Sequence, residues 1–292
     1  MSSPDVLRAR LFLSRAVEPP APAVHHFVAV HGPVDAVSRI RNGAAPAAVL
    51  SEVARQDPQV EDDLRAIDNG TARLLVPEDE EWPLGRLSAL VGYGVPLALW
   101  LRGNASLAEL TNTAVTITGS RASSAYGNTI AAHFGSALAD AGAAVVSGGS
   151  LGVDEAAHHG ALAANGPTVV VLPCGVDRTY PRQHVRLYEQ IVDQGGLLVS
   201  EYSIGAVPIR ARFRARCRLL AALTAATVIV EAGRRSGALT VAGVANDLGR
   251  RVYGVPGPIH SATSTGVNEL LRVGTATVMT SLDHVHYRDG LR

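Results

Sequence analysis

The segment RARFRARCR, residues 210–218, places an arginine at every second position. The chain contains no lysine, and the acids that flank this segment are as distant as Glu201 and Glu231. Strict alternation would put all five arginines on one face of a strand, but the sequence RCRLLAALTAA has the character of a helix. We therefore expect the alternation to hold only as far as Arg214. Clustered guanidinium groups without local acids are what the phosphates of a nucleic acid attract.

Three glycine-rich segments form a second group of residues with possible chemistry. Glycine lets backbone N–H groups approach an anion closely, and the start of a following helix adds a partial positive charge. Together with Arg121, Arg234 and Arg235, these segments predict a phosphate-binding rim. The simpler alternative is that each segment is only a tight turn. The segments are GSRASSAYG (119–127), GGSLGVDEAAHHG (148–160) and AGRRSGALT (232–240).

Other chemistries find less support. Neither a G-x-G-x-x-G fingerprint nor a phosphate loop with lysine is present, so we expect no nucleotide cofactor. Asp154 is predicted to cap a helix, and its pairing with His158 lacks a third ligand, so we expect no metal. Ser147 and Ser236 have neither a nucleophile elbow nor evident His and Asp partners, which argues against a hydrolase triad. Cys174 is predicted to be a small core residue.

Charge is segregated along the chain. Residues 1–118 carry 10 Arg and 14 acids, whereas residues 119–292 carry 16 Arg and 12 acids, which favours a basic surface in the second part. No apolar run reaches about 18 residues and the amino terminus lacks a long apolar region, so we expect neither a membrane span nor a signal peptide. The two cysteines have no CxxC spacing and indicate a cytoplasmic protein with reduced thiols.

These residues need elements to position them, and the pattern after about residue 112 supplies them. Short β-branched runs alternate with helical stretches such as 129–142, where Gly142 fits the stop position. The runs are continuously apolar, as strands buried on both faces require. The alternation predicts an α/β fold over 113–285, with a doubly wound, mostly parallel sheet of an extended Rossmann-like kind. The runs are AVTIT (114–118), AAVVS (143–147), TVVVL (168–172), GLLVS (196–200), TVIVE (227–231), RVYGV (251–255) and ATVM (276–279).

The first part of the chain has a different character. Residues 1–70 are acidic and rich in Ala and Pro, with helical patches and no convincing strands, which predicts a small helical domain. Residues 71–112 are interpreted as a connector that packs on the α/β domain.

Seven motifs in order resemble the DNA-processing protein A family, also called Smf, which handles incoming single-stranded DNA in natural transformation. The similarity spans about residues 75–280. It implies a sterile-alpha-motif-like fold for residues 1–70, and the chain ends before the winged-helix extension of many members. The motifs are TGSRASSAYG, SGGSLGVDEAAHHGAL, VLPCGVDRTYP, SEY, FRARCRLLAAL, VIVEAGRRSGALTVA and VPGPIHSATSTGVNELLRVGTA.

The resemblance also implies a DNA-binding site and partners. It places Phe213 where an aromatic ring stacks on a base and Arg210 where a basic residue meets phosphate, and Arg216 and Arg218 match an R-x-R pair. It implies a binding protein, not an enzyme, that protects single-stranded DNA and passes it to a RecA-type recombinase, as a homodimer. The predicted DNA-binding set is Gly119, Ser120, Arg121, Ser147, Gly148, Gly149, Asp154, His158, Arg210, Phe213, Arg216, Arg218, Arg234, Ser236, Gly237 and Thr240.

Two positions depart from the family pattern, and one other function stays open. Cys217 stands where the family usually has Asn, and Leu151 stands where a basic residue is usual. The alternative function is a nucleotide N-glycosidase similar to the Lonely Guy phosphoribohydrolases. Their P-G-G-x-G-T-x-x-E run corresponds here to EAGRRSGALT (231–240), which lacks the trailing Glu.

Overall fold

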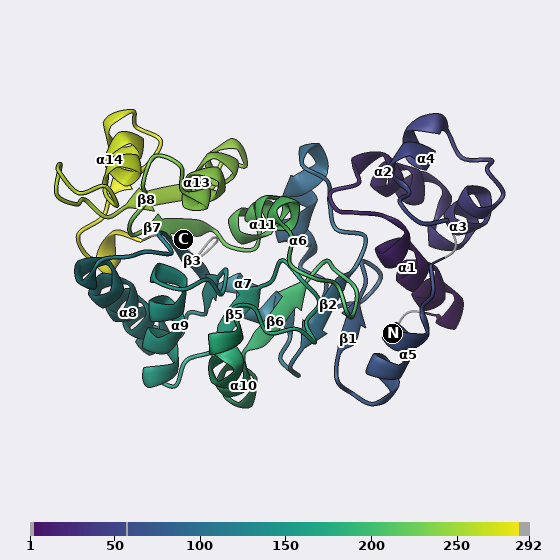
Figure 1. Ribbon diagram of the computed structural model, residues 1–292, viewed down its shortest axis with the longest axis horizontal. Coiled ribbons are helices and arrows are strands. Elements are labelled where there is room, and N and C mark those ends of the chain that lie inside the picture. The colour runs from purple at the N-terminus through teal and green to yellow at the C-terminus, as the bar shows by residue number, and fades with distance from the viewer. Residues whose placement is uncertain (1–2, 57, 286–292) are drawn as a thin grey trace. The chain divides into compact units, whose positions relative to one another are not determined.

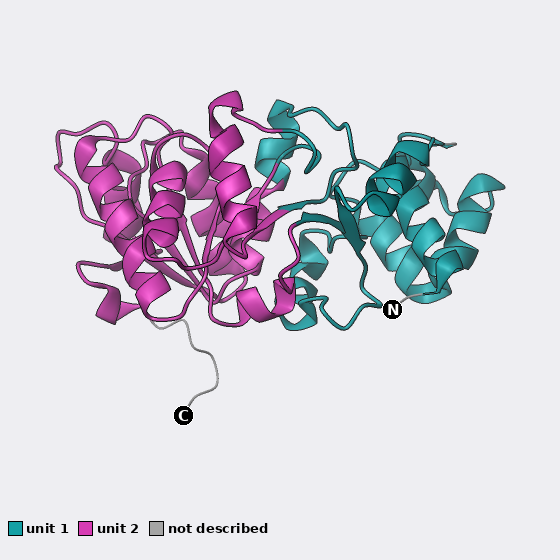
Figure 2. Ribbon diagram, turned by 90° about the horizontal axis from the view of Figure 1, so that it is seen from below, with its two compact units in different colours: residues 1–102, 173–178, 199–215 teal, residues 103–172, 179–198, 216–292 magenta. Residues whose placement is uncertain are grey.

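The computed structural model describes residues 3–56 and 58–285. The chain divides into two compact units, each made of separate segments (Figure 2). The predicted domain limits at residues 70 and 112 rest on the sequence and stay a prediction. Unit 1 consists of residues 1–102, 173–178 and 199–215, and unit 2 of residues 103–172, 179–198 and 216–292.

The amino-terminal part of unit 1 is helical. It contains α1 (Pro4–Ala16), α2 (Pro22–His31), α3 (Pro33–Arg41), α4 (Ala47–Glu52) and α5 (Glu61–Asp68). Proline opens the first three of these helices, where its fixed φ suits the first turn and its missing N–H leaves no donor unpaired. Gly32, with a φ of 74°, separates α2 from α3 in a conformation that a side chain would strain. The apolar faces of α1 to α4 share one core around Phe12, Val24 and Ile40.

The remainder of unit 1 includes a pair of strands within the segment interpreted as a connector. Its elements are β1 (Arg73–Leu75), α6 (Leu84–Leu87), the 3-10 turn η1 (Ser88–Gly92), β2 (Leu99–Arg102) and α11 (Arg210–Ala215). β1 and β2 are antiparallel, with Leu74 opposite Trp100. The Trp100 indole N–H donates to the Ser14 hydroxyl at 3.4 Å, which ties β2 to α1.

Unit 2 is built on the predicted parallel sheet. Its strands are β3 (Val115–Thr118), β4 (Val145–Ser147), β5 (Thr168–Val171), β6 (Leu197–Ser200, which begins in unit 2), β7 (Ala226–Ile229), β8 (Arg251–Gly254) and β9 (Thr277–Val278). Each of the seven apolar runs overlaps one strand, and the order is β6-β5-β4-β3-β7-β8-β9. The pairings of β3 with β4 and β7, of β4 with β5, and of β8 with β7 and β9 are parallel. The predicted α/β fold with a mostly parallel sheet is confirmed.

Helices cover both faces of this sheet (Figure 1). The helical elements are α7 (Leu107–Asn112), α8 (Ala125–Asp140), α9 (Val153–Ala163), η2 (Arg182–His184), α10 (Val185–Asp193), α12 (Cys217–Ala222), α13 (Gly237–Asp247), α14 (Thr265–Arg272) and η3 (Leu282–His284). Val115 and Ile117 of β3 pack in the core formed with α8 and α9. The hydroxyl of Thr116, which lies between them, donates to the Leu220 carbonyl of α12 at 2.7 Å, so successive residues meet opposite layers.

The strand order reverses between β3 and β7. From β3 the chain proceeds through β4, β5 and β6 on one side, and then returns to β7 and continues through β8 and β9 on the other. In open α/β sheets, ligands bind in the crevice beyond the carboxyl ends of the strands at such a reversal. The fold therefore predicts a ligand site at the loops that follow Thr118 and Ile229. No helix in the part of the chain that the structure describes is long and apolar enough to cross a bilayer.

Candidate nucleic-acid interface

The three glycine-rich loops follow adjacent strands and each leads into a helix. β3 lies between β4 and β7, so the carboxyl ends of these parallel strands are neighbours. The loop after β3 precedes α8, the loop after β4 precedes α9, and the loop after β7 precedes α13. Helix N-termini, whose first N–H groups have no intrahelical acceptor, therefore gather at one edge of the sheet.

Asp154 locks the loop after β4, and the prediction that it caps α9 is wrong. Gly152 occupies the cap position, and Asp154 is the second residue of the helix. Its buried carboxylate accepts from the Thr118 hydroxyl at 2.8 Å and from the N–H and hydroxyl of Ser150 at 3.1 and 2.5 Å. The Val153 N–H donates to the Ser120 carbonyl at 3.2 Å. The loops after β3 and β4 are therefore fixed to each other.

Buried side chains hold the turn at Gly148 and Gly149 by hydrogen bonds to its carbonyl groups. The Arg216 guanidinium donates to the carbonyl of Gly148 and, at 2.9 Å, to that of Val171. The Tyr188 hydroxyl donates to the Gly149 carbonyl at 3.2 Å, and a Cβ at Gly149, where φ is 67°, would collide with that hydroxyl. Glycine is therefore required here both by conformation and by close approach.

Arg216 and Arg218 lie deeper than the family pattern suggests. Only 6% of Arg216 and 4% of Arg218 is exposed. Arg216 uses its guanidinium on backbone carbonyls, so in this conformation it positions the glycine turn. A buried charged donor on such carbonyls also makes the turn more electropositive for a bound anion.

Ser147 and His158, two more of the predicted residues, have no exposed surface. The Ser147 hydroxyl donates to the Ile117 carbonyl at 2.6 Å and joins β4 to β3. His158 Nδ1 lies 2.7 Å from the Thr168 hydroxyl, which itself donates to the Val145 carbonyl, so Nδ1 is the donor. Burial lowers the pKa of His158 to about 3 and keeps the ring neutral. Ser147 therefore supports the carboxyl end of β4 beneath the loops, whereas His158 supports the amino ends of β5 and β4.

Sequence reasoning missed Glu231, which ends the run TVIVE. Only 2% of Glu231 is exposed, and no described cation pairs with it. Its carboxylate accepts from the Ser124 N–H at 2.8 Å, the Ser124 hydroxyl at 2.6 Å and the Thr263 hydroxyl at 3.1 Å. A charged residue that closes an otherwise apolar strand was the available signal. Glu231 anchors the start of α8 to the end of β7.

The three helix N-termini are consequently not equivalent. The carboxylate of Glu231 lies at the start of α8, and that of Asp154 lies in the first turn of α9. The first turn of α13 contains no acid, and the Ser236 hydroxyl accepts from the Ala238 N–H at 3.3 Å. The exposed residues Arg234, Arg235, Gly237 and Thr240 surround this start, and Arg121 is exposed on the loop after β3. The start of α13 is the most favourable place for an external anion.

Residues 210–215 are helical, so the predicted alternation along a strand is wrong. They form α11 of unit 1, whereas Arg216 and Arg218 belong to unit 2. Arg212 pairs with Glu18 through two contacts of 2.7 and 2.8 Å, and the guanidinium lies 4.5 Å from the centre of the Tyr202 ring. The hydrogen bond to Glu18 raises the pKa of Arg212. The segment lacks acids nearby in sequence but gains one 194 residues away. Arg210 is exposed and Phe213 is half-buried.

Two exposed tyrosines at the same sheet edge add aromatic surface that the sequence analysis did not include. Tyr126, in the first turn of α8, is 45% exposed, and its hydroxyl donates to the Pro256 carbonyl at 3.1 Å. Tyr180, in the loop after β5, is 40% exposed. Its carbonyl accepts from the same Tyr188 hydroxyl that contacts Gly149, at 2.7 Å. Half-exposed rings beside glycine turns can stack on unpaired bases.

The two departures from the family pattern lie at this edge as well. The Cys217 thiol donates to the carbonyl of Gly237, the first residue of α13, at 3.8 Å. Burial raises the pKa of this thiol and keeps it uncharged. Leu151 is exposed on the loop after β4, so a neutral side chain faces solvent where the family resemblance implies a basic residue.

Comparison with known proteins identifies the family. Residues 73–288 match the family model of DNA recombination-mediator protein A. A putative DNA processing protein DprA of Mycobacterium tuberculosis is 41% identical over 290 residues, which cover 96% of this chain and 74% of the relative. Protein Smf of Escherichia coli is 37% identical over 204 residues, covering 70% of this chain and 54% of the relative.

Two solved structures agree. The structure of DprA from Streptococcus pneumoniae has a TM-score of 0.77 at 27% identity and covers 98% of this chain and 100% of its own. That of Helicobacter pylori DprA, described for its single-stranded DNA binding mode, has a TM-score of 0.64 at 29% identity and covers 73% and 92%. With the family model, the sequence relatives and the solved structures in agreement, this chain belongs to the DNA recombination-mediator protein A family, known as DprA or Smf.

Proposed function

We propose that this protein binds single-stranded DNA across the carboxyl ends of β3 and β7 and acts in DNA processing during natural transformation. The observation that carries the proposal is the exposed trio Arg121, Arg234 and Arg235 at the reversal of strand order, beside the acid-free start of α13. The membership of the chain in the family and the single-stranded DNA binding of the Helicobacter pylori relative support it.

Phosphate contacts would supply most of the affinity. The exposed guanidinium groups and the partial positive charge at the start of α13 attract the backbone whatever the base sequence. Arg210 of unit 1 is exposed and stays a predicted phosphate contact. Asp154, Glu231 and Arg216 act indirectly, because they fix the loops on which these groups lie.

Aromatic stacking would select single strands. Tyr126, Tyr180 and the half-buried Phe213 offer ring faces, which an unpaired base can cover and a base in a stacked duplex cannot. The interface includes no exposed recognition helix that reads base edges, as far as the described residues show. Discrimination between base sequences is therefore expected to be weak, and Leu151 in place of a cation is expected to lower the affinity.

The family resemblance extends the proposal to partners. We infer that the bound strand is protected from nucleases and transferred to a RecA-type recombinase, and that two copies of the chain cooperate. Two linked binding sites would raise the affinity by effective concentration and offset the charge lost at Leu151. We also infer that the site binds without catalysis. Incubation with nucleoside monophosphates should release no base, whereas an N-glycosidase similar to the Lonely Guy enzymes would release it.

The proposal is tested by competition at fixed salt. A labelled oligothymidylate bound to the full-length protein is displaced by unlabelled single strands of several sequences or by a duplex at equal nucleotide concentration. Single strands should displace the label far better than the duplex, with little difference between sequences, because the ring faces require unpaired bases. Equal displacement by the two forms would contradict the stacking arrangement, and preference for the duplex would overturn the proposal.

A further inference from the structure

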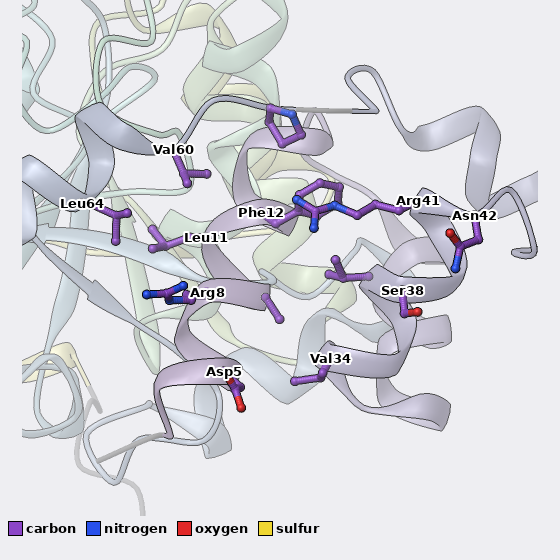
Figure 3. A pocket seen from close by; sticks show the side chains of 13 residues that line it. Asp5, Arg8, Leu11, Phe12, Val34, Ser38, Arg41, Asn42, Val60 and Leu64 are labelled. Atoms are coloured by element: carbon purple, nitrogen blue, oxygen red, sulfur yellow. The ribbon is translucent and has the colours of Figure 1, made fainter.

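Unit 1 contains a groove, and none of its lining residues is among those assigned to DNA. It has a volume of about 530 Å³ and runs between α1 and α3, with α5 and the segment before it on the other side (Figure 3). Volumes of this size are typical of sites that bind ligands. Its lining includes Asp5, Arg8 and Phe12 from α1, and Val34, Val37 and Arg41 from α3.

Helical spacing explains why these side chains share the groove. On each helix the three residues just named are three, four or seven positions apart, which places them on one face. The groove covers the span from Asp5 to Phe12, which at 1.5 Å per residue is about 10 Å, or two helical turns. Phe12 and Val37 are buried beneath the groove. The accessible apolar surface, the floor of the groove, comes from Val34, which is 49% exposed, and from the half-buried Val60 and Leu64.

The groove carries two arginines in a part of the chain that is acidic overall. Residues 1–118 are acidic overall, and five arginines there pair with carboxylates, namely Arg10, Arg15, Arg39, Arg65 and Arg73. Arg8 and Arg41 are exposed and form no ion pair with any described acid. Arg41 instead lies over the Phe12 ring, 4.5 Å from its centre (Figure 3). Two guanidinium groups therefore stand beside an apolar floor.

The charges of the lining residues differ between the two ends of the groove. Arg41 and Phe12 lie at one end, and Asp5 and Val34 lie at the other, with Arg8 between them (Figure 3). A ligand with carboxylates near Arg41 and Arg8 would be attracted, and the same charges near Asp5 would be repelled. The apolar floor favours a ligand with apolar side chains, because contact removes the apolar surfaces of both from water.

Nucleic acid fits this groove poorly. Only 3% of Phe12 is exposed, and Arg41 covers its ring, so no base can stack there. The net negative charge of residues 1–118 repels a long polyanion. A ligand with few carboxylates and several apolar side chains meets neither obstacle.

We propose that this groove docks a short amphipathic segment of a partner protein, with apolar side chains on one face and carboxylates at one end. The segment lays two or three apolar side chains on the floor over about two turns, as amphipathic helices do in hydrophobic grooves. Its carboxylates pair with Arg8 and Arg41, and its uncharged end lies near Asp5. The site is independent of the proposed DNA interface.

The test uses the full-length protein and a labelled synthetic peptide of about nine residues, with leucine and phenylalanine at helical spacing and three glutamates at its carboxyl end. Fluorescence anisotropy should show saturable binding, and a scrambled peptide of equal composition should bind at least about tenfold more weakly, because the apolar and acidic positions no longer coincide with the groove. Absence of saturable binding, or equal binding of the scrambled peptide, would overturn the proposal.

Matched variants locate the contact. Arg8→Glu with Arg41→Glu, and separately Val34→Glu, should each weaken the peptide by about tenfold or more. Arg65→Glu changes an exposed arginine outside the groove lining and should alter the affinity by less than about twofold. A peptide with arginine in place of glutamate should regain binding to the Arg8→Glu, Arg41→Glu protein, which excludes misfolding as the cause.

Three other results would contradict the assignment. The groove variants should bind oligothymidylate as the wild type does, so a loss of DNA affinity would place the groove in the DNA interface. Displacement of the peptide by oligothymidylate would likewise show that the groove is part of the DNA interface. A change of oligomeric state in Val34→Glu, measured by light scattering, would assign the groove to a second copy of the chain. If DNA binding itself fails in the wild type while the peptide binds, only the proposed function is lost.

Discussion

At the scale of single residues, the candidate site separates side chains that contact a ligand from those that position the contacts. Asp154, Glu231 and Arg216 carry formal charge and would each attract a counter-ion if exposed. All three are buried and use their charge on loop backbone or hydroxyl groups. Arg121, Arg234 and Arg235 are exposed instead, and they are the cations proposed to contact phosphate.

Phe213 gives the clearest prediction about stacking. Phe213→Ala should weaken single-stranded DNA binding by about 1–3 kcal/mol and leave the slope of log affinity against log salt unchanged, because no charge is removed. Equilibrium titrations at three salt concentrations measure both quantities. A slope change as large as that of an arginine variant would show that stacking is the wrong account. A large loss of thermal stability with unchanged DNA affinity would make Phe213 a packing residue of unit 1.

His158 predicts a pH dependence of stability. The unfolded chain takes up a proton on this ring near the ordinary value of 6.5, whereas the folded protein does so only near the lowered pKa of about 3. Acid therefore favours unfolding between these values, and this one group lowers the free energy of unfolding by up to about 1.4 kcal/mol per pH unit as the pH falls. Urea unfolding of His158→Gln between pH 6 and pH 4 should show a shallower dependence than the wild type.

The exposed neighbour His159 provides the control for that experiment. His159→Gln should keep the dependence of the wild type. If His158→Gln also kept it, the His158 ring would already accept a proton in the folded state, and its burial would not be the cause.

At the scale of elements, the strands of unit 2 could be predicted and other elements could not. A strand covered on both faces must be apolar at every position, and this produced seven legible runs. β1 is only three residues long, too short for a period to show. The alternating arginines of α11 are typical of a strand, but residues 210–215 form a helix. Contacts with residues distant in the sequence, such as that of Arg212 with Glu18, are not visible in the local pattern. Glu231 was missed because its partner Ser124 is 107 residues away in the sequence.

Two helical glycines, one at the contact between α8 and α9 and one away from it, are predicted to respond oppositely to substitution by alanine. A Cβ at Gly160 of α9 would collide with the Ala132 carbonyl of α8, whereas a Cβ at Gly243 of α13 would meet nothing within 4 Å. Gly160→Ala should therefore destabilise the protein by about 1–3 kcal/mol. Gly243→Ala should stabilise it by about 0.5–1 kcal/mol, since alanine favours the helix. Denaturant unfolding measures both. Equal effects would mean that α8 and α9 do not approach as closely as described.

At the scale of the whole molecule, fold and site arise from one feature, the reversal of strand order between β3 and β7. The reversal brings glycine loops and helix starts together, and buried carboxylates already occupy two of the helix starts. The chain has no net charge, so attraction for DNA depends on where its arginines lie and not on their total. The exposed arginines at the carboxyl edge of the sheet are therefore expected to bind phosphate.

The salt dependence of oligothymidylate affinity tests this claim most directly. The variant with Arg121, Arg234 and Arg235 all changed to Ala is compared with Arg251→Ala, whose exposed arginine lies at the opposite, amino end of β8. Three lost phosphate contacts should lower the slope of log affinity against log salt by about 2, at roughly 0.7 per contact, and Arg251→Ala should leave it unchanged. An unchanged slope in the triple variant, or an equal change per arginine in Arg251→Ala, would contradict binding at this edge.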